Sequence, residues 1–165
     1  MSTVGSSTIK AITIWQPYAS LIMIGAKRFE TRSWPTSYRG SLVIHAAKRW
    51  DEDRALDCLV IKRIMQDSDF DESKLTESQW RLSRLPFSDT LGRALGVVDL
   101  VNCRQMDCSG SELENQLGSF GPGRYGWECE NPRCFEQPIY HTGKQGLWVP
   151  DVHLQRSVAN LLSES

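Results

Sequence analysis

Several features that this chain of 165 residues lacks narrow its possible functions. No apolar run approaches the ~20 residues that a membrane-spanning helix needs, so no membrane partner is expected. Residues 1–8 are rich in Ser, Thr and Gly and lack the apolar segment of a secretory signal, which favours a cytoplasmic protein. Internal repeats are also missing. We therefore expect a flexible tail over 1–8 and a single globular domain over 9–162.

The cysteines are few and odd in number, and this argues against a disulfide framework. Five thiols without a secretory signal are typical of a reduced, intracellular chain. The spacings Cys103-x₄-Cys108 and Cys129-x₄-Cys134 leave a four-thiolate zinc site open, although zinc knuckles usually have tighter spacings. The glycine-rich stretch 118–126 lacks the Gly-Lys-Ser/Thr of a phosphate loop. We expect no metal and no cofactor.

A net charge of −1 conceals an uneven distribution of charge along the chain. Between Lys10 and Arg49 there are seven basic residues and one acidic residue, and the remainder of the chain has an acidic excess. If this basic third folds onto one face, it forms a positive patch suited to polyanions. The alternative is that these charges are scattered over a solvated surface.

Hydrophobic periodicity and turn residues predict the order of the structural elements. Strands are expected at 9–15, 28–32, 40–47, 92–103, 125–129, 135–140 and 146–150, and helices at 17–25, 51–66, 76–84, 109–117 and 152–161. An acidic linker at 67–75 makes 50–90 an acidic helical insertion. Because strands dominate both ends and do not alternate with helices, the order predicts an α+β fold with a mixed sheet or small barrel.

Chemically versatile side chains are concentrated in one N-terminal block. It contains Trp15-Gln16-Pro17, then Gly25-x-Lys27-x-x-Glu30-x-Arg32-x-Trp34, then Tyr38-Arg39-Gly40 and His45-x-x-Lys48. Strand alternation would place Arg28, Glu30 and Arg32 on one face, an arrangement that can hold a phosphate or a base edge. An exposed strand face with ordinary ion pairs is the alternative, and His45 can equally be a structural histidine.

A single-stranded or extruded base needs a flat surface for stacking and polar groups for its edge. The candidates for stacking are Trp15, Trp34, Tyr38 and Trp127, those for the base edge are Gln16, Glu30 and Arg32, and those for phosphate are Lys27, Arg39 and Lys48. His45 completes the set. Each tryptophan can instead belong to the core, which we prefer for Trp148.

This block resembles the opening of an ASCH domain, the activating-signal-cointegrator homology domain of the PUA-like superfamily. The resemblance covers WQPYASLIMIGAKRFETRSWPTSYRGSLVIHAAK, continues in GRALGVVDLVNC and YGWECENPRCFEQPIYHTGKQGLWVPD, and spans about residues 10–152. It implies a small β-barrel surrounded by helices, with a cleft between the barrel mouth and the first helix. Members of the family are linked to DNA binding by a transcription coactivator, to a single-strand ribonuclease, and to an amidohydrolase acting on N4-acylated cytidine.

Three hypotheses for function follow. The first is binding of RNA, single-stranded DNA or a modified nucleoside in the basic cleft. The second is a hydrolase at the same cleft, an N4-acylcytidine amidohydrolase or a ribonuclease, with Lys27, Glu30 and Tyr38 in acid–base roles. In the amidohydrolases that the chain resembles, a nucleophilic threonine occupies the position of Glu30. The third is a protein-interaction module that uses the acidic insertion.

The first two hypotheses require Lys27, Glu30, Arg32 and Lys48 to line one cavity. They also predict that Lys27 and Arg32 face the cleft without supporting the core.

Overall fold

The computed structural model describes residues 8–164, so most of the expected tail lies outside the described part. The strands are β1 (Lys10–Ile14), β2 (Phe29–Arg32), β3 (Gly40–Ala46), β4 (Arg93–Gln105), β5 (Tyr125–Tyr140) and β6 (Leu147–Trp148). The helices are α1 (Tyr18–Met23), α2 (Glu52–Gln66), α3 (Glu77–Arg84), α4 (Glu112–Leu117) and α5 (Val152–Ser163). Short 3₁₀ turns at Glu72–Lys74 and Phe87–Thr90 flank α3.

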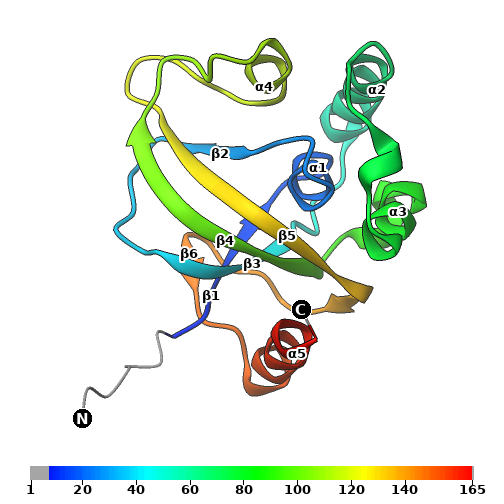
Figure 1. The fold of residues 1–165 in the computed structure, drawn as a ribbon, viewed down its shortest axis with the longest axis vertical. Coiled ribbons are helices and arrows are strands. Elements are labelled where there is room, and N and C mark those ends of the chain that lie inside the picture. The colour runs from blue at the N-terminus through cyan, green and yellow to red at the C-terminus, as the bar shows by residue number, and fades with distance from the viewer. Residues whose placement is uncertain (1–7, 165) are drawn as a thin grey trace.

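The six strands form one sheet in the order β2-β5-β4-β3-β1-β6. Only β1 and β3 run parallel, and the other neighbours are antiparallel. The sheet curls into a half-barrel, and α5 lies apart from the other four helices (Figure 1). The α+β prediction of a small barrel surrounded by helices is confirmed, with a barrel that remains open along one side.

Alternating side chains fill a core on each face of the sheet. On one face, Ile12, Leu42 and Ile44 join residues of α1 and α3. On the other, the neighbouring positions Ala11 and Val43 pack with α5. This two-sided burial explains why the strands read as almost continuous apolar runs.

The C-terminal half departs from the prediction in one respect that affects the shape of the sheet. The segments 125–129 and 135–140 belong to a single strand, β5, because the Asn-Pro pair at 131–132 forms a bulge and not a turn. Asn131 has a φ of 51°, and the four residues Glu130–Arg133 of β5 lie opposite the three residues Val97–Asp99 of β4. Such a bulge bends a strand and increases its twist, which helps the sheet to curl.

Two further expectations concern membranes and cysteines. Among the described residues, no helix is both long and apolar enough to cross a membrane. All five cysteines are free thiols, and residues 8–164 contain no cluster of His, Cys, Asp or Glu arranged to hold a metal ion.

The close approach of β4 to β5 and α1 generates a stability prediction at Gly96. A Cβ atom there would lie 2.2 Å from the Arg133 carbonyl oxygen and 2.6 Å from Met23 Cε. Gly96→Ala should therefore lower the free energy of unfolding by about 1–3 kcal/mol, measured by urea denaturation. Val101→Ala, at an exposed position of the same strand, should cost less. Equal stability of Gly96→Ala and the parent would contradict this packing.

Candidate functional site

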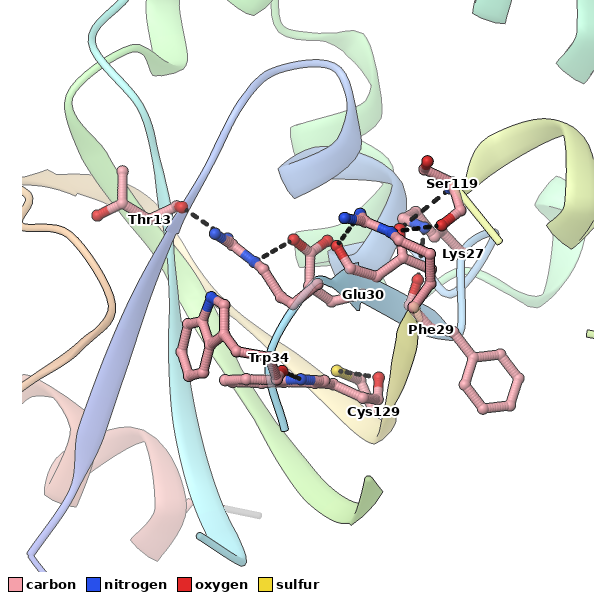
Figure 2. Close-up of polar contacts among 11 residues, drawn as sticks. Thr13, Lys27, Phe29, Glu30, Trp34, Ser119 and Cys129 are labelled. Carbon is pink, nitrogen blue, oxygen red and sulfur yellow. Dashed lines mark hydrogen bonds and ion pairs between the residues drawn. The ribbon is translucent and has the colours of Figure 1, made fainter. Parts of the chain in front are cut away.

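The candidate site lies along the open side of the half-barrel, where β2 faces β1 across the gap in the sheet. Arg32 on β2 spans this gap, with Nε 2.8 Å from Glu30 Oε1 and Nη2 donating to the Thr13 carbonyl at 3.0 Å (Figure 2). Two cavities flank this link, and both are lined by Thr13, Trp15, Arg32 and Trp34. We call these four residues the seam.

The first, here called the Lys27 cavity, has a volume of about 580 Å³. It is bounded by the end of β1, by β2, and by parts of α1, α2 and the segment after α4. Its lining beyond the seam comprises Ile14, Tyr18, Lys27, Glu30, Thr31, Ser33, Arg54, Asp57, Gln116, Leu117, Gly118, Ser119 and Arg124. The loop that follows α4 is fixed to β2, because Ser119 N–H and Arg124 Nη2 donate to Thr31.

Lys27 is almost fully buried, with 2% of its surface exposed, and its Nζ donates to the Phe29 carbonyl. Burial lowers the pKa of this ammonium, and the nearby Glu30 and Glu114 carboxylates oppose the shift. Burial also raises the pKa of Glu114, whose carboxylate accepts the Arg28 backbone N–H. Gly118 leaves room for the lysine, since a Cβ there would lie 3.1 Å from Nζ.

Two tryptophans give the seam a rigid aromatic surface. Trp34 meets Trp127 edge-on with ring centroids 4.7 Å apart, and Trp127 Nε1 donates to the Trp34 carbonyl at 3.2 Å. Trp127 is completely buried and lines neither cavity, so it supports Trp34 from the core side. Trp15 is 44% exposed, and the guanidinium carbon of Arg54 lies 4.2 Å from the centroid of its ring.

The second, here called the Lys48 cavity, has a volume of about 770 Å³. Beyond the seam it is lined by His45, Lys48, Gly92, Tyr140, His141, Thr142, Gly143, Lys144, Gln145 and Gly146. Its wall after β5 is anchored through His45, whose Nε2 donates to the His141 carbonyl at 2.6 Å. The remaining nitrogen, Nδ1, then accepts from the Thr13 hydroxyl at 3.3 Å. Thr13 Oγ1 in turn accepts from Trp148 Nε1 at 3.1 Å.

The structure distributes the predicted site residues over three environments. Trp15, Lys27, Glu30, Arg32 and Trp34 line the Lys27 cavity. Lys48 and His45 line the Lys48 cavity. The expectation that Lys48 shares one cavity with Lys27 and Glu30 is therefore wrong. Gln16, Tyr38, Arg39 and Trp127 line neither.

The residues outside the cavities have structural contacts. Gln16 is buried and holds the start of α1, because its Oε1 accepts from Ser20 N–H and its Nε2 donates to Ser20 and Thr90. Tyr38 donates its hydroxyl hydrogen to the Ser41 carbonyl, and Arg39 donates to carbonyls of its own loop.

Two expectations about the basic residues in and before β2 are wrong. Arg28 precedes the strand and pairs with Glu128 and Glu130 on β5, so it does not share a face with Glu30 and Arg32. Lys27 and Arg32 also support the fold, since both donate to backbone carbonyls while buried or half-buried.

Four charged side chains of the site were missed because other parts of the chain supply them. Arg54 and Asp57 come from α2, while Arg124 and Lys144 come from loops flanking β5. A sequence signal existed only for Arg54, which lies at helical spacing from Asp57 and forms an ion pair with it at 3.0 Å. Together the two cavities are lined by six lysines and arginines and two carboxylates.

In a comparison with protein families, the family model of the ASCH domain matches residues 12–139. The chain belongs to the ASCH domain family. The family is linked to interaction with nucleic acid, and its PUA-like fold agrees with the half-barrel.

Curated relatives of this ASCH domain are larger proteins. Human activating signal cointegrator 1 is 32% identical over 141 residues, which cover 85% of this chain and 22% of that protein. The mouse protein of the same name is 26% identical over 144 residues, with the same coverage of both chains. The ASCH domain described here thus spans about a fifth of the length of these relatives.

Solved structures share the fold at low sequence identity. The crystal structure of ASCH from Zymomonas mobilis superposes with a TM-score of 0.52 and 13% identity, covering 93% of this chain and 95% of that one. A mutant of the same bacterial protein gives a TM-score of 0.50 and 12% identity, covering 93% and 98%. At this identity the likeness establishes the fold alone.

Buried His45 generates a prediction about pH. Burial lowers its pKa below the usual 6.5, so on acidification the unfolded chain takes up a proton before the folded one does. The free energy of unfolding should therefore fall between about pH 7 and pH 5 more steeply for the parent than for His45→Gln, in urea titrations. A parental slope in His45→Gln would refute this assignment.

Proposed function

We propose that the seam and the Lys27 cavity bind a base of RNA or single-stranded DNA, or a modified nucleoside. The observation that carries this proposal is the excess of positive charge around the two cavities of a chain whose net charge is −1. Six basic and two acidic side chains line the two cavities, and Trp34 lies between them. Such a concentration of cations attracts polyanions.

The polar groups of the Lys27 cavity suit the edge of a base. Glu30 is held by Arg32 and remains 8% exposed, so its carboxylate can accept a hydrogen bond from an exocyclic amine. Arg32 uses Nε and Nη2 for its internal contacts, and Nη1 takes part in neither. Trp34, braced by Trp127, supplies a flat surface beside both groups, and stacking of a base on such a ring contributes about 1–3 kcal/mol.

The environment of Lys27 favours a second candidate, a hydrolase at the same cleft. A buried amine with a lowered pKa next to a carboxylate is a common arrangement in acid–base catalysis. Glu30 would then act as a general base on water, and Lys27 would stabilise negative charge or deliver a proton. Tyr38 takes no part in this scheme, since its hydroxyl donates to Ser41 and lines neither cavity.

The exposed apolar side chains of α2 favour a third candidate, an interaction with another protein. Leu56, Leu59 and Val60 are each at least half exposed on this helix. Binding through such a surface depends weakly on salt, whereas binding through phosphate contacts weakens steeply as salt rises. A salt titration of the bound complex therefore separates this candidate from the proposed function.

Arg32→Ala tests the seam. Its loss should weaken binding of single-stranded RNA or DNA, or of a nucleoside from a panel of modified forms, by about ten- to a hundred-fold in isothermal titration calorimetry. Arg28→Ala removes the same charge from a residue just before β2 that lines neither cavity, and it should leave the affinity within about two-fold of the parent. Urea titrations of both variants separate loss of binding from loss of fold. Unchanged affinity in Arg32→Ala would refute the proposed site.

Glu30→Gln separates binding from catalysis. A binding site keeps part of its affinity, because the amide oxygen remains an acceptor. A hydrolase that uses Glu30 as a base keeps binding and loses turnover of N4-acylcytidine or RNA, measured by chromatography of the products. If the parent shows no turnover of either substrate at high enzyme concentration, the hydrolase candidate is wrong.

A further inference from the structure

We infer that the two cavities bind successive parts of one single-stranded oligonucleotide, with a base in the Lys27 cavity and backbone phosphate in the Lys48 cavity. The ligand is then a dinucleotide or longer chain, and not a free nucleoside. This inference rests on the proposed function and specifies the class of its ligand.

The first support is the different charge of the two cavities. The Lys27 cavity combines its cations with two carboxylates, Glu30 and Asp57, which disfavour a phosphate and suit the donor groups of a base. The Lys48 cavity is lined by Arg32, Lys48 and Lys144, and no carboxylate is among its described lining residues. The Lys48 cavity is therefore the more favourable of the two for a phosphate, and it lies on the far side of the seam from Glu30.

The second support is the continuity of the cleft. Each seam residue lines both cavities, so the two cavities lie directly beside each other, and a ligand that occupies both has to cross Trp34 and Arg32. The guanidinium of Arg32 is fixed between Glu30 and the Thr13 carbonyl. Because its Nη1 is outside both contacts, Arg32 can donate to the phosphate that joins the two parts of the ligand.

The third support is size. The cavities of about 580 and 770 Å³ each fall within the roughly 300–1,000 Å³ that small-molecule sites occupy. A lone phosphate leaves most of the Lys48 cavity empty, whereas a following nucleotide fills it. Tyr140, which is 66% exposed on its rim, offers a ring for the next base.

The glycine-rich wall of the Lys48 cavity lets a ligand backbone approach closely. Gly143 packs so tightly over His45 and Thr13 that a Cβ would lie 2.7 Å from either side chain. Through this contact and the His45–His141 hydrogen bond the wall is held in place before any ligand arrives. A preformed wall reduces the ordering cost of binding.

The experiment compares ligands of increasing phosphate content on the parent protein. Calorimetry uses the four ribonucleosides with a panel of modified forms, the 5′-monophosphates, and a random-sequence ribohexanucleotide. The hexanucleotide should bind about ten-fold or more tightly than the best monophosphate, and the monophosphate more tightly than its nucleoside. A free nucleotide as the true ligand would instead give equal affinity for monophosphate and hexanucleotide, and would overturn the inference.

The double variant Lys48→Ala/Lys144→Ala locates the phosphate. Both side chains are exposed, so the fold should tolerate their removal. Hexanucleotide affinity should fall about ten-fold, and the slope of log affinity against log salt should shrink by about 0.7 for each phosphate contact removed. Nucleoside affinity should stay at the parental value. The control Lys62→Ala/Lys74→Ala makes the same charge change on α2 and the turn after it, and should leave both affinities unchanged.

The outcomes separate this inference from the function on which it rests. If a nucleoside binds as tightly as the hexanucleotide, or if the double variant weakens both ligands equally, the inference is wrong and the proposed function stands. If no base-containing ligand binds the parent, both are wrong. Both are supported if the affinity rises from nucleoside to monophosphate to hexanucleotide, and if the double variant loses affinity only for the ligands that carry phosphate.

Discussion

The bridge from Arg32 to Thr13 is the contact on which the candidate site depends. In the order β2-β5-β4-β3-β1-β6, β2 is one edge and β1 lies almost at the other, so no backbone ladder can join them without closing the barrel. One guanidinium spans the gap instead, holding Glu30 on its own strand and the Thr13 carbonyl on the facing strand. The opening that remains on each side of this side chain is a cavity. The incomplete closure of the sheet thus creates the cleft, and Arg32 divides it.

The distribution of charge follows from the same architecture. The basic N-terminal third does not fold onto one face as a unit, since Arg28 is neutralised by Glu128 and Glu130 and Arg39 donates to its own loop. Cations from α2 and from the loops flanking β5 replace them around the cleft. The cleft of this near-neutral protein is therefore positive because the fold brings distant basic residues together, and not because the chain has an excess of them.

The sequence predicted what is encoded locally. Runs of apolar and β-branched residues predict β1 and β3, and apolar residues at helical spacing predict α2. Strand parity failed at Arg28 because β2 begins one residue later, and a turn was expected where Asn131 accommodates a bulge. Local patterns also cannot show which distant residues converge, so Arg124 and Lys144 had no signal. The sequence around Trp127 and Trp34 does not show which of the two is buried. Trp127 is buried because it pairs with Glu30 inside the curled sheet.

The arrangement of the tryptophans has a spectroscopic consequence. Trp127 and Trp148 are buried, and Trp50 and Trp80 are exposed outside both cavities, whereas Trp15 and Trp34 belong to the seam. Any aromatic molecule that enters the cleft contacts Trp15 and Trp34, and the environment of the other four tryptophans does not change. The intrinsic tryptophan fluorescence of the protein therefore reports whether the cleft is occupied. Quenching by a bound ligand is confined to the part of the fluorescence that Trp15 and Trp34 emit.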